Sequence, residues 1–135
     1  MAFDQTLTTQ AKFIALQHLA TGTLKMALYT ANADLGAGTL VYTTTDEVIG
    51  TGYTAGGNTL TNVTVQQSGT TAFLDFDNVV WNPANFTARG ALIYNTSLGN
   101  LAVAVLDFGA DKTTTTTFTV QTPANTADAA LIRFS

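Results

Sequence analysis

The chain has 135 residues, no cysteine and a net charge of −4, and charged residues make up only 10% of it, against an average of about 25%. This length suits one domain, and the lack of cysteine excludes disulfides, a thiolate nucleophile and a Cys-based zinc site. The five basic residues are scattered, which argues against a nucleic-acid surface. No run approaches the roughly 20 apolar residues of a transmembrane helix, and the N-terminus lacks the features of a secretory signal. We therefore expect no nucleic-acid or membrane partner, and synthesis in the cytoplasm.

Helical spacing is confined to a segment near the N-terminus. Residues 10–20 contain neither Gly nor Pro, Thr8 or Thr9 can cap a helix there, and Gly22 can end it. The sequence predicts one short amphipathic helix within an N-terminal arm of residues 1–22. This helix is expected to pack on the domain edge or on a neighbouring subunit.

After Gly22 the apolar residues alternate with polar ones, as in strands. The segment 46–53 fits either a strand or an extended arm, and the apolar run 101–108 suggests burial on both faces in the middle of a sheet, followed by a loop over 109–116. The remaining strands are expected at residues 23–30, 40–43, 59–67, 71–76, 79–81, 86–95, 118–122 and 130–134. Turn signals about every ten residues predict one all-β domain over residues 23–135, an antiparallel β-sandwich most simply of jelly-roll type.

The sequence offers no group of residues that suggests catalysis. His18 is the single histidine, it falls in the predicted helix, and no G-x-S-x-G motif accompanies it. Asp75 and Asp77 would share one strand face, but the calcium-loop pattern around them is incomplete. We expect a protein that is not an enzyme and that uses no metal or cofactor.

Arg89 lies in the middle of an otherwise apolar predicted strand. An unpaired charge there would be costly, so we expect Arg89 to pair with an acid of its own sheet or across a subunit interface. Asp107 and Asp111 bracket another strand end and are among the acids available for such a pair.

Aromatic side chains on strand faces raise a different possibility, which is stacking on sugar rings. As core or interface residues the same side chains need no such purpose. The candidates are Tyr29, Tyr42, Tyr53, Trp81 and Tyr94.

Several segments resemble a pattern in small structural proteins of tailed bacteriophages. The resemblance covers nearly the whole chain from Lys12 onward, and it implies a virion component of the head surface or the tail with no catalytic residues. The segments are Lys25–Thr30, Tyr42–Val48, Gly50–Gly57, Ala88–Asn95 and Ala102–Gly109.

The leading hypothesis is a capsid decoration, or cement, protein. Dimers or trimers of the chain would sit on the outer capsid surface and bridge subunits of the major capsid protein, through residues 2–20 or the loop 31–38. The alternative is a tail- or fibre-associated module that binds host glycan. The residues expected to contact a partner are Phe3, Phe13, Leu16, Leu35, Tyr53 and Trp81.

Overall fold

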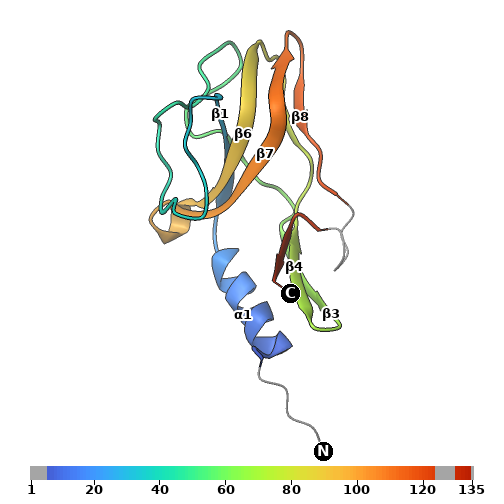
Figure 1. Cartoon of the computed structure of the whole chain (residues 1–135). Helices are drawn as coiled ribbons and strands as arrows, with labels where there is room; N and C mark the ends of the chain where they lie inside the picture. The colour runs from blue at the N-terminus through green and yellow to red at the C-terminus, as the bar shows by residue number, and fades with distance from the viewer. Residues whose placement is uncertain (1–5, 124–129, 135) are drawn as a thin grey trace, which may run out of the picture.

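The computed structural model describes residues 6–123 and 130–134, and within them it confirms antiparallel sheets packed as a sandwich together with one short helix (Figure 1). The elements are α1 (Thr9–Leu19), β1 (Leu24–Tyr29), β2 (Asn58–Thr59), β3 (Thr64–Ser68), β4 (Thr71–Asp75), β5 (Val79–Trp81), β6 (Phe86–Asn95), the short 3-10 turn η1 (Thr96–Leu98), β7 (Leu101–Thr114), β8 (Phe118–Val120) and β9 (Ile132–Phe134). The sheets have the strand orders β2-β1-β6-β7, β3-β4-β9 and β5-β8. The finer jelly-roll arrangement stays a prediction.

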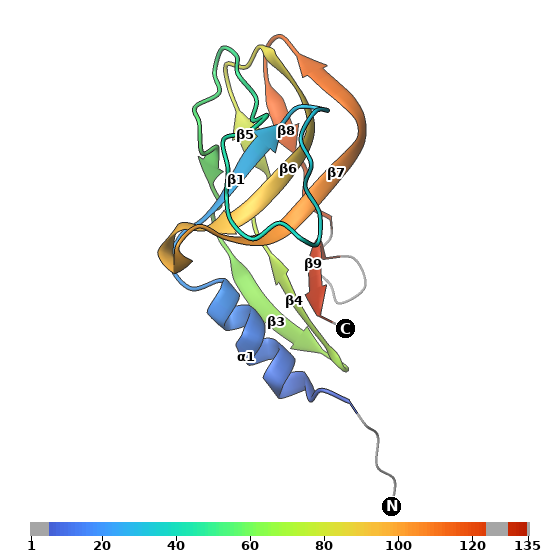
Figure 2. The ribbon, with the colours of Figure 1, turned by 60° about the vertical axis from the view of Figure 1, so that its left-hand side comes forward.

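The helix forms where the sequence predicts it, and it packs on the chain's own sheet. The Thr8 side chain caps α1 by accepting a hydrogen bond from the amide of Ala11 at 3.2 Å. Figure 2 shows α1 lying beside β3 and β4, and the helix also contacts β9. Leu16 and Lys12 are both buried. Lys12 Nζ reaches the turn between β3 and β4 and donates to the carbonyl of Thr70 at 2.8 Å, which satisfies the buried ammonium in part. Of the two packing positions expected for the helix, the domain edge is the one observed.

The large sheet is apolar on both faces because different parts of the chain cover them. Leu24, Met26 and Leu28 of β1 face the main core, whereas Ala27 and Tyr29 face a second, smaller apolar cluster. Partly buried residues of the following loop pack against this second cluster, namely Ala33, Leu35 and Tyr42. Alternate strand residues point to opposite faces, so this loop is what makes β1 a buried strand on both sides.

The apolar run 101–108 lies at an edge of the large sheet, not in its middle. It belongs to β7, which pairs with β6 on one side and is the last strand in the order. The second face of β7 is covered in part by the loop around Leu35 and Leu40, which gives the two-sided pattern that the sequence shows. The expected loop over 109–116 is also wrong, because the strand bends at Gly109 (φ 80°) and then continues, pairing Lys112 and Thr113 with β6.

Two other expected strands are only partly formed. Residues 40–43 make a single bridge to Leu101, and residues 46–53 form an extended arm with isolated bridges at Glu47 and Thr51. The predicted strand 59–67 is interrupted by a left-handed residue, Asn62 (φ 53°), which separates β2 from β3. In these segments the turn residues end the regular pairing before a long ladder can form.

Candidate functional site

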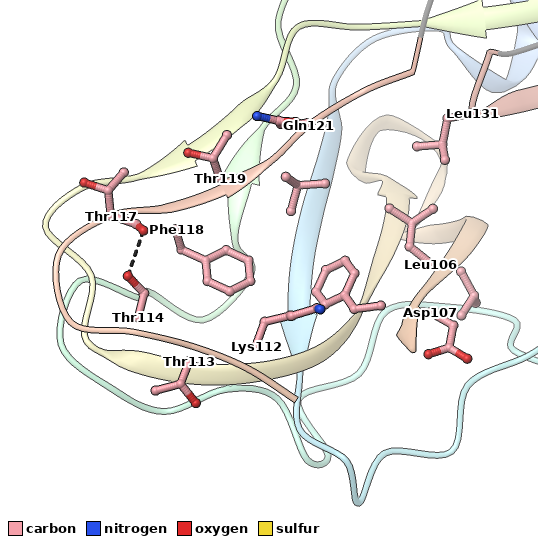
Figure 3. Close-up of a pocket in the computed structure, with 13 residues that line it drawn as sticks. Leu106, Asp107, Lys112, Thr113, Thr114, Thr117, Phe118, Thr119, Gln121 and Leu131 are labelled. Atoms are coloured by element: carbon pink, nitrogen blue, oxygen red, sulfur yellow. Dashed lines mark hydrogen bonds between the residues drawn. The ribbon is translucent and has the colours of Figure 1, made fainter. Parts of the chain in front are cut away.

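An open groove, here called the seam, lies between β7 and β8. These strands follow each other in the chain and diverge from the turn at residues 115–117, and each is the last strand of its sheet. Within the described residues no strand lies between them. The seam is a groove with a volume of about 730 Å³, shown in Figure 3.

Apolar side chains form the floor of this groove. Leu106 and Phe108 come from β7, Phe118 and Val120 from β8, and Leu131 stands at the end nearest β9. The rings of Phe108 and Phe118 meet across the floor with their centres 6.1 Å apart. At the other end the Thr114 hydroxyl donates to the carbonyl of Thr117 at 2.7 Å, which ties the two strands together near their turn.

The β7 side of the groove carries backbone groups without a strand partner. Successive residues of β6 hydrogen-bond alternately with β1 and with β7. The amide of Thr96, directly after β6, donates to the carbonyl of Thr23, so the even-numbered residues of β6 hydrogen-bond with β1 and the odd-numbered ones with β7. The register pairs β7 residues 104 and 106 with odd-numbered residues of β6, and Val105 and Asp107 with even-numbered ones. The amide and carbonyl groups of Val105 and Asp107 therefore point away from β6, toward the outside of the sheet.

Arg89 lies beside this edge and pairs within its own sheet, which confirms one of the two pairings expected for it. Its guanidinium is 4.0 Å from Asp107 and 3.7 Å from Asp111, both on β7. The register of β6 and β7 shifts next to Arg89, because Gly90 pairs with Asp107 and Ala88 with Lys112. Residues 108–111 of β7, which include Asp111, therefore lie opposite Arg89. The side chains are substantially exposed, so the contribution of each pair to stability is small.

The same register shift changes which β6 residues face the core. Strict alternation predicts that Phe86, Ala88, Leu92 and Tyr94 share one face. The structure instead places Phe86 and Ala88 in the main core together with Ala91 and Ile93, while Leu92 and Tyr94 face the second cluster. An irregularity in the pairing alters the twist of a strand, which is why a period of two does not hold through it.

A buried carboxylate forms a second site, which sequence reasoning missed. Glu47 is 6% exposed and accepts three hydrogen bonds, from Tyr42 Oη at 2.6 Å, from the amide of Gly56 at 2.8 Å and from Tyr53 Oη. Tyr53 Oη also accepts the amide of Leu28 of β1 at 2.9 Å. These contacts fasten the arm 46–57 to the large sheet. The one available sequence signal is that Glu47 is the only glutamate of the chain and lies between two tyrosines.

All four tyrosines of the chain gather around this carboxylate. Tyr94 Oη donates to the carbonyl of Gly56 at 2.7 Å, Tyr29 Oη donates to the carbonyl of Thr43 at 2.6 Å, and the rings of Tyr42 and Tyr94 stack with their centres 4.5 Å apart. Burial raises the pKa of each tyrosine, and the negative charge of Glu47 raises each pKa further. The cluster is a structural network in which two tyrosine hydroxyls donate to the carboxylate and two donate to backbone carbonyls beside it.

The side chains expected to contact a partner do not form one surface. Leu16 and Trp81 are each 2% exposed, and Tyr53 packs 6.3 Å from Trp81 in the interior, so these three side chains contact the chain's own core. Phe13 on α1 and Leu35 on the loop are partly buried in different parts of the molecule. Phe3 lies outside the described residues. None of these side chains lines the seam.

The other candidate chemistry stays weak in the structure. His18 is exposed on α1, and the Asp77 carboxylate accepts hydrogen bonds from Thr61 and Asn62. In the part of the chain that the structure describes, no three His, Cys, Asp or Glu side chains are grouped so that they could hold a metal ion. No helix there is long and apolar enough to cross a membrane.

No protein-family model, curated protein or solved structure matches this chain.

Proposed function

We propose that the chain is a structural protein of a tailed-bacteriophage virion, and that it acts as a decoration protein on the outer surface of the capsid. The observation that carries this proposal is the open seam between β7 and β8. It combines backbone groups at Val105 and Asp107, which have no strand partner among the described residues, with an apolar groove. Proteins that remain alone in solution usually blunt or cover such an edge, whereas assembling proteins use it to pair with a neighbour.

Composition supports the same function. Only 10% of the residues are charged, so the chain has few of the like-charge repulsions that keep a surface from associating. The resemblance of its segments to structural proteins of tailed bacteriophages supports a virion as the assembly. A protein that binds the completed lattice and not the free subunits stabilises that lattice by mass action.

The glycan-binding alternative finds less support. It needs aromatic rings on the surface, but Tyr29, Tyr94 and Trp81 are each at most 2% exposed. The remaining tyrosines are engaged with Glu47. No aromatic platform for a sugar ring is left among the five candidate side chains.

Two measurements on virions test the proposal. Mass spectrometry of purified particles should find hundreds of copies per virion, and labelling of the intact particle should place them on the shell. Shells assembled without the protein should bind it when it is added back, and should then resist heat better than untreated shells. A signal at the tail alone, about a dozen copies or fewer, or no binding to shells would overturn the proposal.

A further inference from the structure

We infer that the seam between β7 and β8 is completed by one extended strand of the major capsid protein, which pairs with the free edges of both strands. This inference rests on the function proposed above and names how the partner is bound. The inserted strand would join the sheet β2-β1-β6-β7 to the sheet β5-β8 on the side where they are open.

The geometry of the groove specifies a polypeptide in extended form. Both walls are outer strands, and the β7 wall presents amide and carbonyl groups at Val105 and Asp107 at the two-residue spacing of a ladder. An extended strand presents donors and acceptors in this same alternation, so it can replace the water at this edge. A strand of about six residues would span about 20 Å, at roughly 3.3 Å per residue.

The opposite side of the sandwich shows what a closed junction looks like in this fold. There β2 approaches β5, and the Asn58 side chain donates to the carbonyl of Val80 at 2.8 Å. The β7–β8 side has one comparable tie, the Thr114–Thr117 hydrogen bond at its turn, and it widens from there into the groove. The seam is therefore the side on which the described residues leave room for a strand.

The lining defines the chemistry of the occupant. Phe118 and Val120 are buried already, and the apolar side chains of the floor that stay partly exposed are Leu106, Phe108 and Leu131. The inward residues of the strand, at every second position, would be apolar to pack on these three. Lys112 also lines the groove, and it has no ion-pair partner among the described residues, whereas Asp107 is already close to Arg89. An acidic residue of the inserted strand beside Lys112 would complement this charge.

A second copy of the chain fits the seam less well. Each described strand is already paired on at least one edge, so a second copy could place a strand between β7 and β8 only by unpairing it. Edge-to-edge pairing of two β7 strands would satisfy one wall of the seam alone. Leu40 and Val41 are exposed apolar residues, but they are adjacent in the chain and so do not alternate as the inward residues of an inserted strand must. Both are also bonded to the start of β7 in their own chain. The partner protein is the better source of the strand.

Hydrogen exchange tests the inference directly. The probe is a shell assembled from the major capsid protein of the genome that encodes this chain, mixed with the full-length protein. On binding, the amides of Val105 and Asp107 should become protected, whereas the amides of residues 104 and 106, already paired with β6, should be protected both before and after binding. Binding with unchanged exchange at Val105 and Asp107 would refute strand insertion and leave the decoration function standing.

Two variants supply an independent measurement. Val105→Pro removes an outward amide from an edge position, where proline is tolerated, and should weaken shell binding about tenfold. Lys112→Glu should weaken binding through charge repulsion even if Val105→Pro fails to fold. The matched surface control is Ile49→Lys, since Ile49 is 96% exposed and does not line the seam, and it should bind as the wild type does.

Three outcomes would contradict the inference. Equal binding by the wild type and Lys112→Glu would place the contact elsewhere on the molecule. Protection of Val105 and Asp107 in the free protein, with a dimer in sedimentation, would identify a second copy as the occupant. No binding of the wild type to shells would overturn the decoration function itself and the inference with it.

Discussion

Tyr53 donates a hydrogen bond to the buried carboxylate of Glu47, and the same hydroxyl accepts the amide of Leu28 at 2.9 Å. One phenol thus joins the arm 46–57 to β1 near the end of that strand. A buried anion is tolerated there because three donors surround it. The loop that covers the second face of the large sheet is held in place largely by this arrangement.

Replacing the carboxylate tests this arrangement. Glu47→Gln keeps the size of the side chain but removes the charge and turns one acceptor into a donor that faces other donors. We expect the free energy of unfolding to fall by about 1–3 kcal/mol, as measured by urea denaturation. The neighbouring Asp46→Asn, at an exposed position, should change it by less than about 0.5 kcal/mol. Equal effects of the two substitutions would show that the buried hydrogen bonds carry no special weight.

The tyrosines predict how stability depends on alkaline pH. Their pKa values are raised above the ordinary value of 10.0 in the folded state, chiefly by burial and then by Glu47. Above pH 10 the folded chain therefore holds more protons than the unfolded chain, so stability is fully present below pH 10 and decreases as the pH rises further.

Ultraviolet absorbance of tyrosinate, recorded together with circular dichroism, measures this. The tyrosines should stay protonated past pH 10 and ionise together as the chain unfolds. A tyrosine that ionises near pH 10 in a chain with intact dichroism would contradict the clustered arrangement.

Position 57 requires glycine for two reasons, the conformation of its backbone and the close approach of β1. Gly57 has φ 78°, and an added Cβ would lie 1.7 Å from the carbonyl oxygen of Met26 in β1. Gly57→Ala should lower the free energy of unfolding by about 3 kcal/mol or more in thermal or urea denaturation, because a backbone must move. Gly69 offers a matched control, since it also has positive φ (59°) but open space around it, and Gly69→Ala should cost about 1 kcal/mol. If both substitutions cost the same, close packing of the arm on β1 would be ruled out.

The ion pairs of Arg89 should matter little for stability. Both contacts are long and exposed, so Asp111→Asn should change the free energy of unfolding by less than about 1 kcal/mol, and the change should shrink as salt is added. Asp34→Asn, at an exposed loop position, serves as the control. A salt-independent loss of several kcal/mol for Asp111→Asn would mean that the pair is structural.

Features that depend on neighbouring residues could be predicted from the sequence. Thr8 caps the start of the helix as expected, and the helix ends at Leu19 with Ala20 as its C-cap, shortly before the expected stop at Gly22. The turn at Gly69 joins two alternating segments as the hairpin of β3 and β4. The class of the fold follows from many such local signals, and so does the prediction that Arg89 needs an acidic partner. In each case the physical cause acts over a few residues of the chain or on one residue's own burial.

Only the tertiary structure decided which distant segments meet. The apolar run of β7 has the same alternation whether a strand or a loop covers its second face, so its place at a sheet edge, and with it the seam to β8, could not be predicted from periodicity. The burial of Glu47 depends on donors at Tyr42, Tyr53 and Gly56, and Tyr94 of the distant strand β6 holds Gly56 in turn. A sequence pattern shows which residues need a hydrogen-bond partner or burial. Which residues provide them depends on backbone pairing and packing between segments far apart in the chain, and therefore on the whole fold.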